Sequence, residues 1–189
     1  VDINGDGRKD IVSCSNDGQH PVLAWYKMPK DIKDNWDYKM IGWGIHGGIS
    51  PVGYGDLDND GDNDIVRGNH WFENLDAGNH WKEHKTLIPP GGNRPDVYGL
   101  AIKTWCYDMD GDGDLDLITG LHSGTDYPVS VWVNNGAGGF SRNDVGTRLY
   151  IKSGDTGDID GDGDLDIITG DGDNKVYKWT SNGLSGSGG

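Results

Sequence analysis

The sequence D-I-D-G-D-G-D-L-D-I at residues 158–167 places aspartates at every second position around two glycines. Three earlier segments repeat the pattern: D-I-N-G-D-G-R-K-D-I from Asp2, D-L-D-N-D-G-D-N-D-I from Asp56 and D-M-D-G-D-G-D-L-D-L from Asp108. The four starts lie 54, 52 and 50 residues apart, and the segments contain 18 of the 31 acidic residues. Regular spacing of this length indicates a repeated structural unit. The clustering indicates that most of the negative charge serves a purpose within these segments.

Each repeated segment has the donor pattern of a calcium loop. Oxygen ligands at every second residue of a tight, glycine-containing loop can surround one hard cation. A solvated acidic turn is the simpler alternative, but its packed carboxylates would repel one another in all four copies. We therefore expect about four Ca²⁺ ions, bound by side chains at positions one, three, five and nine and by the carbonyl at position seven. The expected ligands are Asp2, Asn4, Asp6, Arg8 and Asp10; Asp56, Asp58, Asp60, Asp62 and Asp64; Asp108, Asp110, Asp112, Asp114 and Asp116; and Asp158, Asp160, Asp162, Asp164 and Asp166.

The residues after each loop exclude an EF-hand. Position twelve of an EF-hand loop is a bidentate Glu, whereas these segments have Ser13, Arg67, Thr119 and Thr169 there. Short β-branched runs follow the loops, such as I-I-T-G at residues 167–170. Runs of this kind are typical of strands rather than helices. Each loop therefore leads into a strand.

The loops and the strands after them resemble the FG-GAP or VCBS repeat, the calcium-loop blade of integrin-α-like β-propellers. The resemblance extends over nearly the whole chain. It implies an all-β fold of four-stranded antiparallel blades, with the calcium loop between strands one and two of each blade. It also implies an extracellular or cell-surface protein, because many members are secreted.

The aligned copies predict the remaining strands of each blade. They are expected at residues 22–28, 71–74, 129–133 and 175–179, then at 36–41, 81–87 and 140–145, and, entering the loops, at 49–55, 100–107 and 149–157. The first blade lacks its loop-entering strand and the last lacks its outer strand, so 14 strands make about three and a half blades. Four tryptophans recur at aligned positions and are expected to pack between blades: Trp25, Trp71, Trp132 and Trp179.

The predicted domain comprises residues 1–180, and a flexible Gly/Ser tail occupies residues 181–189. Three arrangements of the incomplete blades stay open at this stage. The chain is part of a longer propeller, or it closes as a four-bladed ring, or two copies associate as half-rings whose 28 strands make seven blades.

The charge balance limits the partners. With 16 basic against 31 acidic residues the formal charge is −15, which excludes a nucleic-acid partner. The sequence has no apolar run of about 18 residues, so we expect no membrane span. Its two cysteines are too few for a disulfide framework.

Basic and aromatic residues are expected to gather at the blade ends opposite the calcium loops, where they would bind a ligand: His20, His46, His70, Arg94, Tyr98, His122, Arg148 and Tyr150. We therefore expect a calcium-stabilised extracellular binding module for glycan or a protein partner. One alternative is part of a polysaccharide lyase or sugar dehydratase, which some relatives on propellers are. Another is a structural adhesion or scaffold repeat. The sequence lacks the common hydrolase, NTPase and zinc motifs, which favours binding over catalysis.

Overall fold

The computed structural model describes residues 1–14, 22–43, 53–68, 70–85, 102–121, 128–147, 151–173 and 175–180. Within these ranges the regular secondary structure consists of β-strands, which pair antiparallel in four separate sheets. No helix of the described ranges is long and apolar enough to cross a membrane. The fold is all-β, as the sequence predicts.

Fourteen strands form the four sheets, each with its strands in sequential order. The first blade contains β1 (Ile11–Cys14), β2 (Val22–Lys27) and β3 (Asp37–Trp43). The second contains β4 (Tyr54–Gly55), β5 (Asp64–Arg67), β6 (His70–Asn74) and β7 (Trp81–His84). The third contains β8 (Ile102–Tyr107), β9 (Asp116–Leu121), β10 (Pro128–Asn134) and β11 (Phe140–Thr147). The fourth contains β12 (Ile151–Gly157), β13 (Asp166–Asp171) and β14 (Val176–Trp179).

This grouping confirms the predicted sheets of three, four, four and three strands. We number the aspartate-rich segments first to fourth loop, starting at Asp2, Asp56, Asp108 and Asp158. The second, third and fourth loops each join strands one and two of their blade, and the first loop precedes β1. The strand expected at residues 49–55 is described only from residue 53 onward, and the one expected at 81–87 only up to residue 85.

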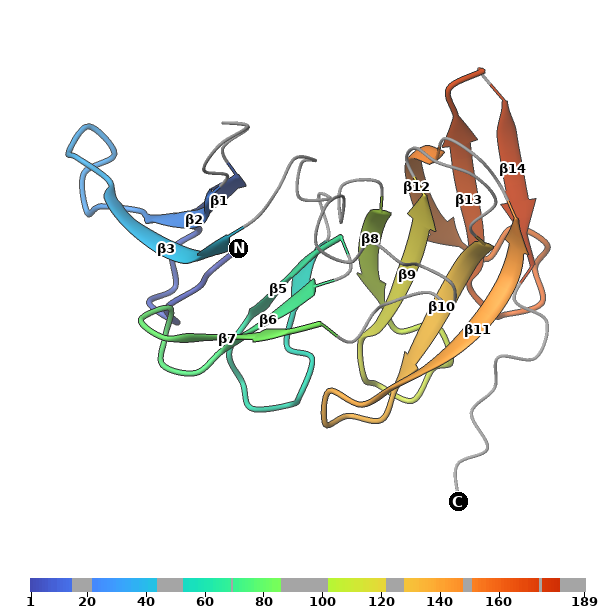
Figure 1. The fold of residues 1–189 in the computed structure, drawn as a ribbon, viewed down its shortest axis with the longest axis horizontal. Coiled ribbons are helices and arrows are strands. Elements are labelled where there is room, and N and C mark those ends of the chain that lie inside the picture. The colour runs from blue at the N-terminus through green and yellow to red at the C-terminus, as the bar shows by residue number, and fades with distance from the viewer. Residues whose placement is uncertain are drawn as a thin grey trace.

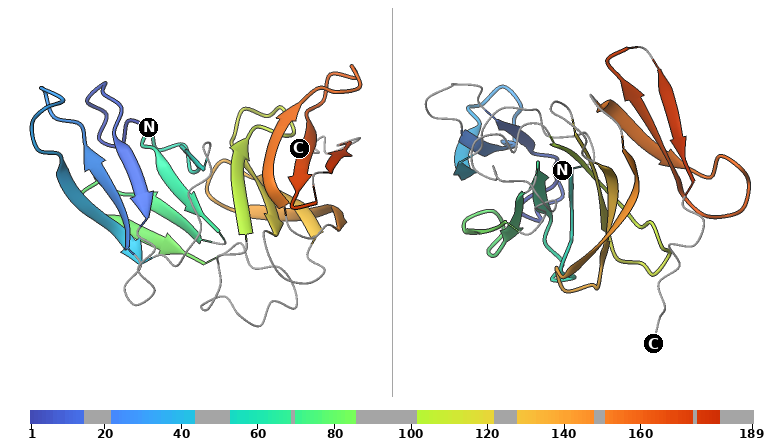
Figure 2. Two further views of the ribbon diagram at one scale, coloured as in Figure 1. Left: turned by 90° about the horizontal axis from the view of Figure 1, so that it is seen from above. Right: turned by 45° about the vertical axis from the view of Figure 1, so that its right-hand side comes forward.

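The blades follow one another in an open arc, with the first and fourth at opposite ends of the molecule (Figures 1 and 2). The described part of the chain is therefore not the four-bladed ring that the sequence left open. Each copy contributes two three-stranded and two four-stranded sheets in the described ranges, so two copies contribute eight.

Three clusters of buried side chains lie between neighbouring blades. Between the first and second blades, Ile3, Leu23 and Trp25 meet Ile65 and Phe72. Every inner blade thus has one apolar face toward the preceding blade and one toward the following blade, and burial of these faces stabilises the arc. The other two clusters are Leu57, Val66 and Trp71 with Cys106, Leu117 and Trp132, and Trp105, Met109, Ile118, Val129 and Val131 with Ile151 and Ile167.

The four strand tryptophans pack between blades but do not share one strand position. Trp71 is opposite Val66, whereas Trp132 is opposite Leu117, which comes one residue earlier relative to its loop. Successive side chains of a strand point to opposite faces, so this difference turns the two rings to opposite sides of their blades. The predicted equivalence is wrong, although the predicted packing between blades is confirmed. Trp25 follows the pattern of Trp71, and Trp179 that of Trp132.

Candidate metal centres

The main chain of each loop turns in the left-handed region at positions four and six. In the second loop φ is 61° at Asn59 and 95° at Gly61. Residues with a side chain are disfavoured there, and Asn tolerates the region better than most. The turn therefore requires the glycines of the motif. They are Gly5, Gly7, Gly111, Gly113, Gly161 and Gly163 in the other loops.

Main-chain N–H groups of each loop donate to its own carboxylates. In the second loop Gly61, at position six, donates to Asp56, at position one, over 2.9 Å. Asp62, at position seven, donates to Asp60, at position five, also over 2.9 Å. These bonds hold the side chains against the loop. The bond from position six to position one recurs from Gly7 to Asp2 (2.8 Å), Gly113 to Asp108 (3.1 Å) and Gly163 to Asp158 (3.2 Å).

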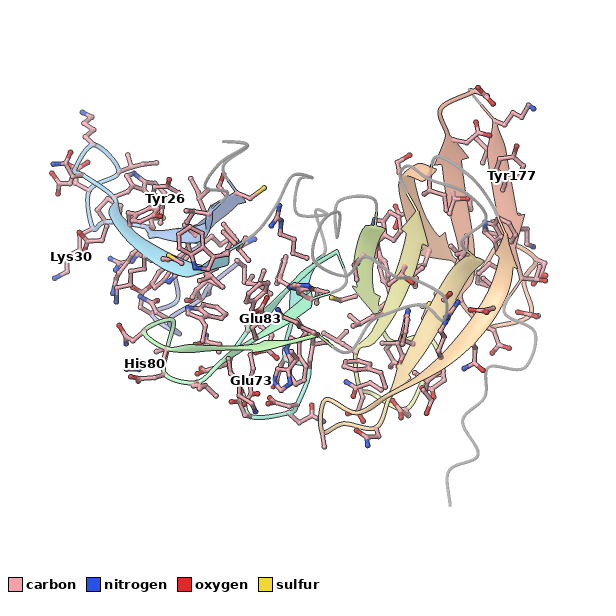
Figure 3. All side chains as sticks on the ribbon, viewed as in Figure 1. Tyr26, Lys30, Glu73, His80, Glu83 and Tyr177 are labelled. Atoms are coloured by element: carbon pink, nitrogen blue, oxygen red, sulfur yellow. The ribbon has the colours of Figure 1, made fainter. Side chains whose placement is uncertain are left out.

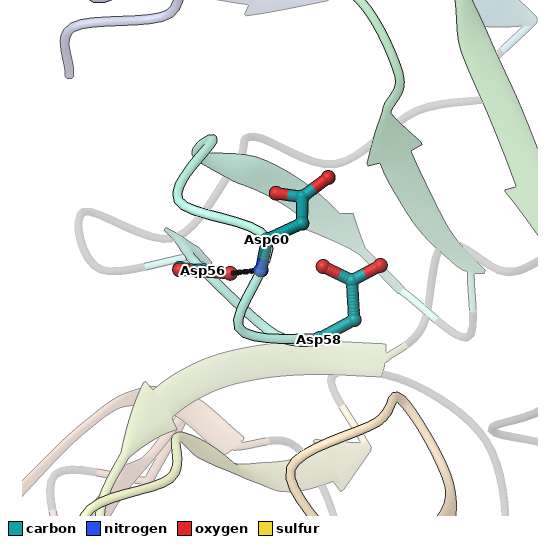
Figure 4. A group of neighbouring side chains, drawn as sticks. All are labelled: Asp56, Asp58 and Asp60. Carbon is teal, nitrogen blue, oxygen red and sulfur yellow. Dashed lines mark hydrogen bonds between the residues drawn. The ribbon is translucent and has the colours of Figure 1, made fainter.

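Three of the four loops bring carboxylates into clusters. In the second loop, oxygens of Asp56, Asp58 and Asp60 lie within 4.8 Å of one another, and Figure 4 shows all three side chains around one turn of the loop. A separation of this size suits several ligands of one cation. Two equivalent clusters are Asp108, Asp110 and Asp116, and Asp158, Asp160 and Asp166.

The aspartate at position nine connects each loop to its own blade. Both oxygens of Asp116 accept main-chain hydrogen bonds, one from Met109 in the loop and one from Asn134 at the end of β10, each 2.8 Å long. Asp116 is fully buried. The sequence analysis treated position nine as a metal ligand only and missed this structural role. Asp10 and Asp64 accept the same two bonds, from Ile3 and Met28 and from Leu57 and Asn74, and Asp166 accepts the bond from Ile159.

The carboxylates of the inner loops lack compensating positive charge. Burial raises the pKa of Asp64 to about 7 and that of Asp116 to about 6, although main-chain hydrogen bonds lower both. Burial first, and then neighbouring aspartates, raise the pKa of Asp58. One oxygen of Asp58 and one of Asp2 are buried and have no hydrogen-bond partner among the described residues. Hard oxygen donors with unpaired buried lone pairs fit a Ca²⁺ ion.

Basic side chains pair with carboxylates of the outer loops. The Arg8 guanidinium lies 2.7 Å from Asp6 in the first loop, and Lys27 lies 3.6 Å from the same carboxylate. At the fourth loop, Lys178 Nζ from β14 lies 3.1 Å from Asp160 and 3.2 Å from Asp166. Across the described ranges, no lysine or arginine ion pair reaches the second or third loop. The four loops therefore differ electrostatically.

Two asparagines that the sequence analysis missed connect the first and second loops to the blade that follows each of them. The Asn74 amide donates to the Ile3 carbonyl of the first loop (3.0 Å), and the Asn134 amide donates to the Leu57 carbonyl of the second (2.8 Å). The signal was present, because both asparagines end the tryptophan strands of their repeats. These bonds therefore couple the conformation of a loop to the packing of the next blade against it.

The structure describes one of the eight residues predicted at the opposite blade ends. His70 Nδ1 lies 2.6 Å from the Glu83 carboxylate, and burial lowers the pKa of the imidazole although Glu83 raises it. Its Nδ1 is therefore engaged in a contact within its own blade. The other seven lie outside the described residues: His20, His46, Arg94, Tyr98, His122, Arg148 and Tyr150.

Comparison with known proteins agrees with the repeat pattern. The family model described as FG-GAP-like repeat matches residues 2–66 and 108–169, more than half of the chain. No curated protein is a significant match. Among solved structures, the chain is similar to a lectin from Agrocybe aegerita described as specifically recognising non-reducing terminal N-acetylglucosamine. The two are 19% identical with a TM-score of 0.49, over 86% of this chain and 47% of the lectin chain. The chain thus spans less than half the length of that lectin.

Proposed function

The chain belongs to the FG-GAP-like repeat family, and from this premise we propose that it is a calcium-stabilised β-propeller module that acts by binding. The observation that supports calcium is the set of three carboxylate clusters, together with the unpaired buried oxygen of Asp58. A repulsive cluster of this kind destabilises the fold unless a cation neutralises it. Bound Ca²⁺ would supply that positive charge.

The residues of each loop have two different roles, ion binding and attachment of the loop to its blade. Positions one, three and five supply carboxylate or amide oxygens near the loop surface, while the buried position-nine aspartate joins the loop to the blade. In the third loop Asp116 belongs to the carboxylate cluster and also accepts the Asn134 N–H at the strand end. Ion binding would therefore fix the end of β10 as well as the loop.

We place the partner at the blade ends opposite the loops and outside the cell. Loops on a rigid scaffold are common sites of recognition, and basic and aromatic residues in a chain of net charge −15 suit a polar or anionic ligand. Millimolar extracellular Ca²⁺ would occupy even sites of modest affinity. Glycan or an extracellular protein is the proposed partner.

Titration calorimetry and a glycan array test the two parts separately. Ca²⁺ should bind in two classes of site, tighter in the second and third loops, where no basic side chain competes, and weaker in the first and fourth. Arg94→Ala and Arg148→Ala should abolish glycan binding and leave the Ca²⁺ titration unchanged. Lys30→Ala, an exposed cation in the turn between β2 and β3 (Figure 3), is the matched control. No binding heat would refute the calcium proposal, and an array without any binder would refute the glycan proposal.

Replacing Lys178 should strengthen ion binding in the fourth loop. The ammonium lies within 3.2 Å of two carboxylates that are expected ligands, so an incoming cation must displace it. In Lys178→Met we expect the weak class in calorimetry to tighten about tenfold, which corresponds to about 1.4 kcal/mol. Lys175→Met, which replaces an exposed lysine immediately before the same strand, is the control and should change nothing. Unchanged affinity in both variants would show that Lys178 does not compete.

A further inference from the structure

The last blade exposes apolar side chains at positions that are buried in every other blade. At position two of the loops, Ile3, Leu57 and Met109 are 1%, 0% and 4% exposed, whereas Ile159 is 42% exposed. In the three earlier blades this residue packs beneath the following blade. No other described sheet packs on this side of the fourth blade, so the apolar position is uncovered.

Strand β14 of the last blade shows the same difference in exposure from its equivalents in earlier blades. Leu23 in β2 and Val129 in β10 are both fully buried, whereas Val176, near the corresponding end of β14, is 73% exposed. Lys178 on the same strand takes the place of Trp25 and Trp71, but its ammonium is paired with loop aspartates. Its aliphatic stem extends the apolar face.

The first blade has the complementary face. Ile11, the first residue after its loop, is 51% exposed, whereas the equivalent Ile65, Leu117 and Ile167 are at most 2% exposed because they face the preceding blade. Beside Ile11, on the same side of this sheet, lie Tyr26 and its cross-strand neighbour Tyr38, which is 53% exposed. Figure 3 shows Tyr26 in the first blade and Tyr177 in the last at opposite ends of the molecule.

We propose that these two faces bind each other between two copies of the chain, head to tail, so that the last blade of each copy packs on the first blade of the other. At each of the three internal interfaces, one face of this kind packs on one face of the other kind. The natural partner for either exposed face is therefore another blade of the same repeat. Two such contacts close a pair with eight sheets, within the range of known propellers, whereas a third copy would exceed it.

Light scattering after size-exclusion chromatography in Ca²⁺ tests this association. The parent chain should elute with twice the mass of one copy. Ile11→Glu and Val176→Glu should each elute as a monomer, because each substitution places a charge in both contacts of the closed pair. Leu75→Glu is the matched control, since Leu75 is 50% exposed in the turn between β6 and β7 of the second blade, which is not an end blade. It should remain a dimer.

Mixing the two variants tests the head-to-tail geometry. Each variant retains the face that the other lost, so an equimolar mixture should regain a pair through one intact contact. A face-to-face pair of first blades would instead be broken by Ile11→Glu alone, which would overturn the geometry. A parent chain that stays monomeric, or oligomers that grow with concentration, would overturn the closed pair. Melting with and without Ca²⁺ reports on the loops separately, so failure here is distinguishable from failure of the calcium proposal.

Discussion

Removing Ca²⁺ with a chelator should lower the midpoint of thermal unfolding by about 10–20 °C. An ion at about one hundred times its dissociation constant stabilises the folded state by about 2.7 kcal/mol per site. The second and third loops, which contain no competing cation, should together contribute about 5 kcal/mol. For a chain of this length each kcal/mol shifts the midpoint by about 2–4 °C. Scanning calorimetry with Ca²⁺ and with chelator measures the difference directly.

Magnesium in place of calcium is the control for that experiment. Mg²⁺ demands near-octahedral geometry and keeps its water ligands, so loops of flexible oxygen donors should gain little from it. We expect the chelated protein in Mg²⁺ to melt close to the chelated protein alone. Coincident curves in Ca²⁺ and chelator would contradict calcium-dependent stability. An equal shift with both ions would indicate general charge screening instead.

The sequence was sufficient for the blade architecture because its signals are local and repeated. Alternating aspartates with glycine at position six define a turn that only a left-handed main chain can make, and Gly61 and its equivalents adopt it. The β-branched run after each loop then fixes strand two. Four copies at nearly constant spacing predicted all four sheets, including the incomplete first and last blades.

The roles that the sequence analysis missed depend on contacts between distant residues. Asn74 donates to Ile3 from 71 residues away, and no local pattern specifies that bond. The tryptophans were misaligned for a related reason. A displacement of one residue between Trp71 and Trp132 leaves the composition of the strand unchanged but reverses the side of the sheet that each ring occupies.

Replacing the position-nine aspartate should destabilise the protein whether or not Ca²⁺ is present. Asp116→Ala leaves the N–H groups of Met109 and Asn134 buried without an acceptor, at about 1–3 kcal/mol each. The cost of burying the carboxylate, evident in its raised pKa, offsets part of this loss. We therefore expect a net loss of about 2–4 kcal/mol in chelator, measured by urea unfolding, and a larger loss in Ca²⁺.

Asp112→Ala separates the structural role of an aspartate from its role as a ligand. Asp112 lies in the same loop but is exposed, and its carboxylate accepts the Asp114 N–H (2.9 Å) in an exposed hydrogen bond that water can replace. We expect Asp112→Ala to match the parent in chelator and to lose stability only in Ca²⁺. Asp116→Ala should lose stability in both. Equal behaviour of the two variants in chelator would show that position nine does not fasten the loop to β10, and that its aspartate acts through the ion alone.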